Sequence, residues 1–100
     1  MYVVVRADLP LAQQAVQAIH AGIFSARELF PPDIVHPSLV LCTVPDQSAL
    51  LALLGRCNQA GIRSRLFVEA DLGHQPTALA TEPVPRQLRK FFRALPLFKV

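Results

Sequence analysis

Three polar side chains lie at helical spacing near the start of the chain and are the first candidates for chemistry. Gln13, Gln17 and His20 are four and three positions apart, so a helix places them on one face. Amides can hold a phosphate or carbonyl oxygen, and an imidazole can take part in proton transfer. A structural histidine bonded to a backbone carbonyl explains the same pattern, and both interpretations stay open.

Two further candidates follow the third expected strand. Asp71 precedes Gly73 at the end of that strand, where a carboxylate can orient water or a neighbouring donor. An acidic loop residue can equally cap its own turn. Thr77 can donate a hydrogen bond from the sheet edge toward the same cleft, although threonine is also a favoured strand residue.

The last part of the chain is markedly basic. Residues 1–85 carry five cations and seven acids, whereas residues 86–100 carry five cations and no acid. Four of these cations lie on one side of the helix expected there and form the basic stripe, made of Arg86, Arg89, Lys90 and Arg93. The stripe can neutralise the phosphates of a nucleic acid or can be a solvated helix face, and both interpretations stay open.

The elements that position these residues are predicted from apolar periodicity and from turn residues. Strands are expected at 2–6, 39–44, 62–69 and 77–81, and helices at about 10–29, 46–61 and 84–95. This order, βαβαββα, predicts an α/β fold of three layers in which helices flank a mixed four-stranded sheet. The helical crossovers favour parallel strands, and the short link after residue 69 allows one antiparallel partner.

Each helix is expected to bury one apolar face. The first helix is expected to bury Ala12, Val16, Ile19 and Ile23. The second is expected to begin with Asp46 as its cap, to end at Gly61, and to bury Leu50, Leu51, Leu53 and Leu54. The last helix is expected to turn toward the core an apolar stripe of Leu88, Phe91, Phe92 and Leu95.

The composition is typical of one folded domain that spans residues 1–100. Apolar residues make up 52% and charged residues 17%, which argues against disorder. No apolar run reaches the ~20 residues of a membrane span and no cleavable leader is recognisable, so a cytoplasmic protein without a membrane partner is expected. Cys42 and Cys57 are expected as buried free thiols. Phosphate-loop, zinc-site and serine-elbow motifs are missing, which argues against those classes of enzyme.

Several blocks, in order along residues 3–84, resemble the archaeal-type peptidyl-tRNA hydrolase family, with this chain as a divergent bacterial member. Val5-Arg6-Ala7-Asp8-Leu9 resembles the family's V-R-x-D-L, and the helix segment 15–21 resembles its A-A-Q-x-x-H-A. Later blocks are similar to its V-P-D-x-x-x-L-L, G-[IL], D-x-G and T-x-L-x-x-x-P motifs, at residues 44–51, 61–62, 71–73 and 77–83.

The resemblance implies the family's fold and reaction. Members of that family cleave the ester between a nascent peptide and tRNA, need no metal or organic cofactor, and often form homodimers. The resemblance therefore implies tRNA or peptidyl-tRNA as the partner, and a second copy of the chain. It implies substrate binding by Gln17 and catalytic roles for His20, Asp71 and Thr77, with Gln13 at the position of a family lysine as the fourth catalytic candidate. The basic stripe lies beyond the matched blocks and is expected to bind substrate because of its charge.

Two departures from the family pattern leave catalysis an open question. The family has a lysine four residues before its helix glutamine, where this chain has Gln13 after a shorter loop. Gln13 carries no charge and stabilises an anionic substrate less than a lysine does. The segment 72–76 is also short, and His74 and Gln75 are candidates to replace what the longer loop does. A hydrolase of weakened activity and a non-catalytic module that binds RNA or protein are therefore the two hypotheses.

Overall fold

A computed structural model describes residues 1–35 and 37–99 of the chain. Its elements are β1 (Tyr2–Arg6), α1 (Leu11–Leu29), β2 (Val40–Val44), α2 (Gln47–Gln59), β3 (Ser64–Glu69), the short 3-10 turn η1 (Ala70–Leu72), β4 (Gln75–Thr81) and the 3-10 helix η2 (Arg86–Phe92). The predicted α/β order βαβαββα is confirmed.

The four strands form one mixed sheet in the order β2-β1-β4-β3. β1 is parallel to β2, while β4 lies between β1 and β3 and is antiparallel to both. The strands β1, β2 and β3 therefore run in one direction. We call the end of the sheet where Arg6 and Glu69 finish their strands and Gln75 begins β4 the carboxyl end, and the opposite end the amino end.

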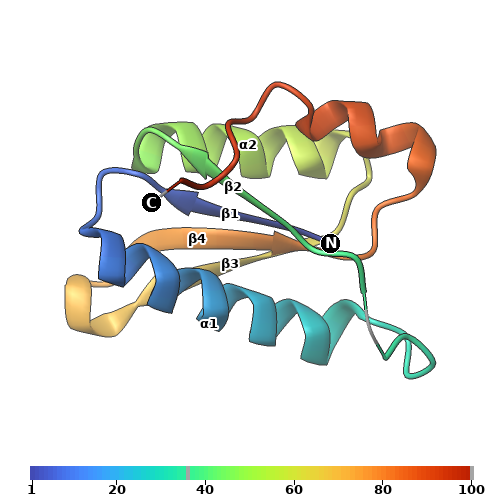
Figure 1. Cartoon of the computed structure of the whole chain (residues 1–100), viewed down its shortest axis with the longest axis horizontal. Helices are drawn as coiled ribbons and strands as arrows, with labels where there is room; N and C mark the ends of the chain where they lie inside the picture. Colours follow the sequence, from blue (N-terminus) through green and yellow to red (C-terminus); the bar gives the residue numbers. More distant parts are fainter. Residues whose placement is uncertain (36, 100) are drawn as a thin grey trace.

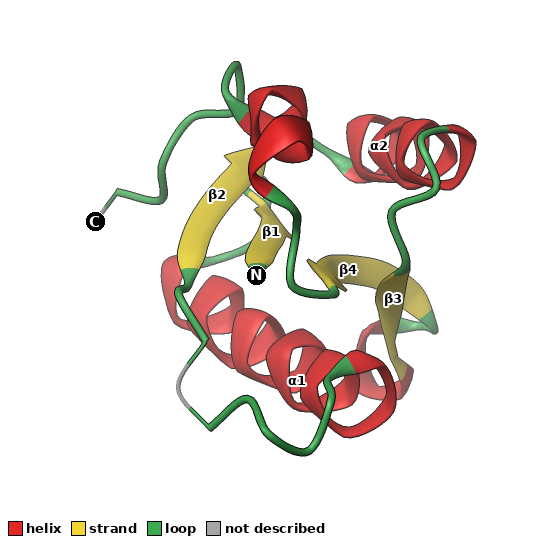
Figure 2. Cartoon of the chain, turned by 90° about the vertical axis from the view of Figure 1, so that its right-hand side faces the viewer, coloured by secondary structure: helices red, strands yellow, loops and turns green. Residues whose placement is uncertain are grey.

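Helices cover both faces of this sheet. In Figures 1 and 2, α1 lies on one face, while α2 and η2 lie on the other. The α2-side core contains Val4, Cys42, Val44, Leu50, Leu53, Cys57, Ile62, Leu79, Val84 and Phe92. The α1-side core contains smaller residues, namely Val3, Val5, Ala18, Ala21, Ala78 and Ala80. Cys42 and Cys57 are buried free thiols, as predicted.

The buried face of α1 is the opposite of the predicted one. Val16, Ile19 and Ile23 are 44%, 63% and 50% exposed, and Ala12 is exposed as well. The face that meets the sheet consists instead of Gln14, Gln17, Ala18, Ala21 and Ser25. The prediction that the larger apolar side chains of α1 are buried is therefore wrong.

The reason lies in the sheet residues beneath α1. Ala78 and Ala80 face the helix, so a helix face of small side chains can approach closely. The polar members of that face are satisfied there, because the Ser25 hydroxyl donates to the Thr81 carbonyl at 2.6 Å and Gln14 Nε2 donates to the Leu9 carbonyl at 2.8 Å. Both faces of α1 have helical spacing, and spacing alone does not distinguish them.

The expected limits of α2 are present. Asp46 Oδ1 accepts a hydrogen bond from the Ala49 backbone at 2.9 Å, and Gly61 leaves the helix with a φ of 74°. Leu50 and Leu53 are buried, but Leu51 is exposed and was wrongly placed in the core. In the described part of the chain, no helix combines the length and apolar character that a membrane crossing requires.

The last helix is shorter and tighter than predicted. Instead of an α-helix over 84–95, η2 is a 3-10 helix over Arg86–Phe92. Pro85 precedes its first residue, where a missing N–H costs no helical hydrogen bond, and Pro96 limits the segment on the other side. Its apolar side still packs on the sheet, where the Phe92 ring stacks on Tyr2 with centroids 4.2 Å apart.

After η2 the chain returns to the sheet. The Thr43 N–H donates to the Pro96 carbonyl and the Phe98 N–H donates to the Leu41 carbonyl, both at 2.9 Å. Cys42 and Leu97 form an antiparallel bridge between these bonds. We call residues 96–98 the strap, because they cover the outer edge of β2.

Candidate functional site

Gln17 is the centre of a hydrogen-bond network on the α1 side of the sheet. Its Oε1 accepts from the Thr77 hydroxyl at 2.7 Å, and its Nε2 donates to Gln13 Oε1 at 3.2 Å and to Glu69 Oε1 at 3.1 Å. Gln17 and Thr77 are fully buried, whereas Gln13 and Glu69 are partly exposed. We call these four residues the glutamine network. It joins α1 to β3 and β4 at the carboxyl end.

A β-bulge directs Thr77 into this network. Phe67 pairs with Ala78 and Val68 pairs with Pro76, so Thr77 is the extra residue of β4. In a regular strand successive side chains point to opposite faces, and Thr77 would then point away from the α1 side, which Ala78 faces. The bulge turns both residues toward α1. Bulges re-aim side chains in this way and are frequent beside functional sites.

The glutamine network fixes the direction of the Gln13 amide. Both N–H bonds of the Gln17 amide are used within the network, so Gln17 has no donor left for a substrate. Gln13 accepts through Oε1, which leaves its own NH₂ group to donate elsewhere. Because Gln13 is partly exposed, this NH₂ group is the donor that the network can offer to a bound oxygen.

Glu69 is a member of the network that the sequence did not identify. Its carboxylate binds Gln17 through one oxygen, and the residue is partly exposed at the last position of β3. The signal was present in the alternation of β3, because Phe67 and Glu69 are two residues apart and share the face that meets α1. Asp71, the acidic residue predicted for the site, lies two positions further along the chain, after the end of β3.

His20 lies beside the glutamine network but outside its hydrogen bonds. The imidazole is exposed and stacks on the Phe67 ring, with centroids 4.6 Å apart and an interplanar angle of 9°. Phe24, one turn further, packs against the same ring from α1 at 5.3 Å. The stacking therefore places His20 beside Phe67, and the carbonyl of Phe67 lies 3.4 Å from the Thr77 hydroxyl.

Asp71 stands at the same end of the molecule without entering the network. It is exposed in η1, and Figure 1 shows this segment between β3 and β4 beside the first turns of α1. Gly73 and His74 follow with positive φ values of 69° and 58°, which form the turn into β4. His74 and Gln75 follow Gly73, and the Gln75 side chain accepts a hydrogen bond from Arg6.

Arg6 forms a second polar cluster at the carboxyl end, on the α2 side of the sheet. The buried guanidinium binds Asp8 through two hydrogen bonds, from Nε at 2.9 Å and from Nη2 at 2.8 Å. Nη1 donates to Gln75 Oε1 at 2.9 Å and to the Pro76 carbonyl at 3.1 Å. We call Arg6 with these partners the arginine clamp. It ties the loop before α1 to the start of β4, next to Thr77.

The clamp also determines the charge state of its two ionic members. The hydrogen bond from Arg6 lowers the pKa of the Asp8 carboxyl, and the same bond raises the pKa of Arg6. Both groups therefore stay charged near neutral pH, as an ion pair. The positive charge of Arg6 is balanced by Asp8 and is not a free cation for a substrate.

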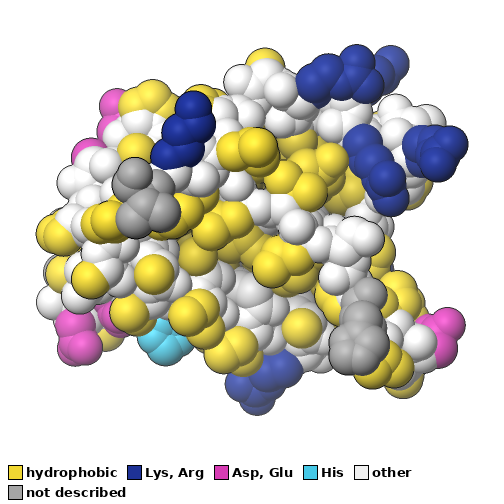
Figure 3. Space-filling view, viewed as in Figure 1, with side chains coloured by type: hydrophobic (Ala, Val, Ile, Leu, Met, Phe, Trp, Pro, Cys, Tyr) yellow, Lys and Arg dark blue, Asp and Glu magenta, His cyan; other side chains and the backbone are white. Residues whose placement is uncertain are grey.

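The basic stripe is not brought together with the glutamine network. Arg86, Arg89, Lys90 and Arg93 are exposed, as a solvated face requires. Figure 1 shows η2 over the end of the sheet opposite to the start of α1, and Figure 3 shows Lys and Arg side chains gathered there. The predicted substrate-binding residues thus occupy two separate regions, with Gln17 at one end and the stripe at the other.

The glutamine network and arginine clamp offer amides, carboxylates and one neutralised cation. Within residues 1–35 and 37–99, no three His, Cys, Asp or Glu side chains come together as a metal-binding group. The chemistry that these residues support is hydrogen bonding and proton transfer at a partly exposed polar surface. Among known proteins, no family model matches the chain and no curated protein matches it significantly.

Proposed function

We propose that the chain is a peptidyl-tRNA hydrolase-like protein whose glutamine network is the site of ester hydrolysis, with a rate below that of the family it resembles. One observation carries this proposal. Gln17 and Thr77 match motifs of that family in separate parts of the sequence, Gln13 stands at the position of the family's lysine, and hydrogen bonds of 2.7 and 3.2 Å join the three. Gln13 and Glu69, which carry a donor and a carboxylate, are partly exposed and can meet a substrate there.

The groups of the network suit the steps of ester hydrolysis. A water molecule must lose a proton as its oxygen bonds to the carbonyl carbon, and the bond from that carbon to the tRNA oxygen must break. Glu69 has one carboxylate oxygen held by Gln17 and a second that can accept a hydrogen bond from the water. The Gln13 NH₂ group donates to the developing oxyanion. The products are a free peptide carboxyl group and a tRNA hydroxyl.

The two other predicted catalytic residues are placed where they can assist. His20 is exposed one turn from Gln17, so it can pass a proton to the departing tRNA oxygen. Asp71 is exposed in η1, two residues after Glu69, and can orient His20 or the water. Gln17 and Thr77 act as positioning residues, because their polar atoms are buried and used by each other.

The missing lysine sets the expected rate. Among the network residues, the donor that faces outward is the neutral amide of Gln13, and Arg6 is neutralised by Asp8. Loss of a donor to an oxyanion commonly costs about 10² to 10³ in rate. The protein is therefore expected to hydrolyse peptidyl-tRNA slowly, in the cytoplasm where tRNA is found.

The position of the basic stripe favours a large substrate. A ligand that reaches both η2 and the glutamine network must span the molecule, whose principal extents are 34 × 26 × 25 Å. A folded RNA can do so, and a small ester cannot. We infer that tRNA contacts the stripe through its phosphates while its peptidyl end reaches the network.

A second copy of the chain is the other partner that we propose. The exposed face of α1 carries Val16, Ile19 and Ile23, and Leu39 beside them is 62% exposed. Ile19 and Leu39, together with Gly22, help to line a hollow of about 270 Å³. Residues 11–26 contain no Asp, Glu, Lys or Arg, so this face can meet itself across a two-fold axis without repulsion between like charges.

The alternative function is a non-catalytic module that binds RNA or a protein on the same fold. It is favoured by Gln13 itself, because a neutral amide can hold a substrate group without stabilising strong negative charge. In that case the glutamine network would serve only to fix α1 on the sheet. The RNA contact through the basic stripe would remain.

The decisive experiment measures loss of the ester from purified peptidyl-tRNA. Gln13→Lys should raise turnover by about 10-fold or more if the rest of the site is competent, since it supplies the missing charge. Gln59→Lys is the matched control, because it adds the same charge on the exposed end of α2, outside the network. Glu69→Gln should abolish activity in both backgrounds. If neither the wild type nor Gln13→Lys cleaves the ester, the binding module replaces the hydrolase as the function.

A further inference from the structure

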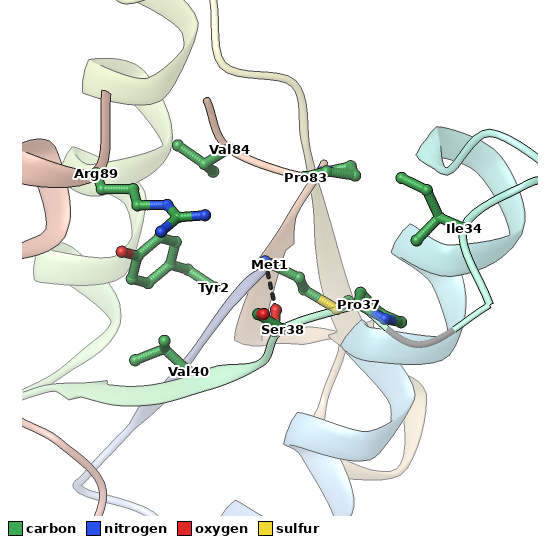
Figure 4. A pocket seen from close by; sticks show the side chains of 9 residues that line it. All are labelled: Met1, Tyr2, Ile34, Pro37, Ser38, Val40, Pro83, Val84 and Arg89. Carbon is green, nitrogen blue, oxygen red and sulfur yellow. Dashed lines mark hydrogen bonds between the residues drawn. The ribbon is translucent and has the colours of Figure 1, made fainter. Parts of the chain in front are cut away.

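A pocket opens at the amino end of the sheet, far from the glutamine network. It lies where β1 and β2 begin and where the chain leaves β4 toward η2, and it has a volume of about 230 Å³. Figure 4 shows Tyr2 and Arg89 on one side and Ile34, Pro37 and Pro83 on the other. We call it the amino-end pocket. None of its described lining residues belongs to the glutamine network or the arginine clamp.

The charge of this pocket is one-sided. Arg89 contributes a guanidinium, and no Asp or Glu is among the described residues that line the pocket. Within residues 1–35 and 37–99, the ion pairs are those of Arg6, Arg63 and Arg65, and Arg89 has none. A cation without a counter-ion at the wall of a pocket favours an anionic ligand group.

A flat apolar surface lies next to that cation. The Tyr2 ring is fixed from one side by Phe92, which stacks on it at 4.2 Å with an angle of 10°. Tyr2 also lines the pocket, where Figure 4 shows the Arg89 guanidinium beside it. The opposite wall is apolar and includes Ile34, Pro37 and Pro83. A planar ring of a ligand can therefore lie against Tyr2 while its anionic group binds Arg89.

A neighbouring hollow extends the site along η2. It has a volume of about 330 Å³ and shares Tyr2, Val40 and Arg89 with the amino-end pocket. Arg93 joins Arg89 in its lining, and again no acid is present among its described residues. Two successive cations along the wall of one groove suit a ligand with more than one negative charge or with a continuing phosphate backbone.

We propose that the amino-end pocket binds a nucleoside phosphate, with the base against Tyr2 and the phosphate on Arg89. The pocket lies outside the glutamine network, at the other end of the sheet, and it shares Arg89 with the basic stripe proposed to contact tRNA. Its test by AMP binding does not depend on ester hydrolysis. A free mononucleotide and the end of a single-stranded RNA present the same chemistry. Both supply a planar ring and a phosphate a few ångströms apart.

The test follows backbone amide signals by NMR during titration with AMP, adenosine and inorganic phosphate. AMP should give saturable shifts confined to the lining residues, with an affinity at least about tenfold above those of adenosine and of phosphate. If phosphate alone binds as well as AMP, only a cationic surface is present and the proposal is overturned. Shifts spread over all exposed cations without saturation would overturn it as well.

Paired variants identify the residues responsible. Arg89→Gln should weaken AMP binding by about tenfold or more, since it removes the charge-assisted contact. Arg86→Gln removes an equal charge from the same helix but outside both hollows, and it should leave AMP affinity unchanged. Equal losses of AMP affinity in the two variants would mean that AMP responds only to the overall positive charge of η2, which would overturn the proposal. Tyr2→Leu, which keeps an apolar side chain, should weaken AMP more than phosphate.

A final experiment distinguishes a free mononucleotide from the end of a single-stranded RNA as the ligand. A short single-stranded RNA with a terminal phosphate is compared with AMP on the wild type and on Arg93→Gln. If the strand is the ligand, it should bind more tightly than AMP, and the loss of Arg93 should affect the strand more. If AMP binds as tightly as the strand and ignores Arg93, the pocket takes the free nucleotide. Binding of neither ligand contradicts the proposal.

Discussion

The Thr77 hydroxyl donates to Gln17 Oε1 at 2.7 Å, and both residues are completely buried. Thr77→Val removes the donor, keeps the shape of the side chain and leaves the Gln17 oxygen buried without its partner. An unsatisfied buried acceptor costs about 1–3 kcal/mol, so the free energy of unfolding in urea should fall by this amount.

The double variant tests whether this cost comes from the pair. Gln17→Leu alone should also destabilise, because it strands the Thr77 hydroxyl. The combination with Thr77→Val should cost less than the sum of the two, with a coupling of roughly 0.5–3 kcal/mol. Strict additivity would mean that the bond contributes nothing to folding.

The exposed apolar face of α1 is the surface through which we expect the chain to form a dimer. Ile19→Glu places a charge at the most exposed position of that face, where a two-fold contact would oppose it to its own copy. The variant should be a monomer under conditions where the wild type is a dimer by light scattering. Ala52→Glu, on the exposed side of α2, is the control and should not change the mass. A wild type that is monomeric at all concentrations contradicts the dimer.

The arginine clamp predicts a loss of stability in acid. The pKa of Asp8 is lower in the folded chain than in the unfolded chain, so the unfolded state takes up a proton first as the pH falls. The contribution of the pair is therefore present above about pH 4 and is lost as the pH falls through the folded pKa. Asp8→Asn should lower the free energy of unfolding at pH 7 by roughly 1 kcal/mol, a modest value because Asp8 is 40% exposed.

The comparison across pH distinguishes the ion pair from a general effect. The difference between wild type and Asp8→Asn should shrink steadily below about pH 4 and vanish once Asp8 is protonated in both states. Asp33→Asn removes an exposed carboxylate in the loop before β2 and is the matched control for the loss of one negative charge. A difference that stays constant down to pH 2 would assign the effect of Asp8 to packing.

The buried thiol of Cys57 should make the folded chain less stable in alkali. Burial raises the pKa of its thiol to about 11, so the unfolded chain loses this proton first as the pH rises. The free energy of unfolding should therefore fall between about pH 9 and pH 11, and Cys57→Ala should remove this part of the fall. The native thiol should also react slowly with a disulfide reagent at pH 8, and quickly once guanidinium unfolds the chain. Rapid labelling of native protein would contradict the buried position.

The limits of the strands were predictable because their apolar residues and turn signals are local. The orientation of α1 was not, because its two stripes have the same period and only the alanines of β4 show which one can approach the sheet. Gln17 and Thr77 were predictable from motif resemblance, but the contact that joins them depends on a β-bulge opposite Phe67 and Val68, which no local pattern signals. The alternation of β3 does place Glu69 on the face of Phe67, but its hydrogen bond to Gln17 depends on which face of α1 meets the sheet, and the sequence pattern predicts the opposite face.

The strap limits how copies of the chain can associate through their sheets. Unpaired strand edges are where sheets recruit further chains, and a sheet with two of them can in principle grow without limit. With residues 96–98 hydrogen-bonded along β2, the described part of the sheet presents one such edge, at β3. Joining through that edge leaves no second free edge in the described part of the sheet, so strand-to-strand growth would end at a pair. Removal of the strap should turn this finite association into open-ended aggregation.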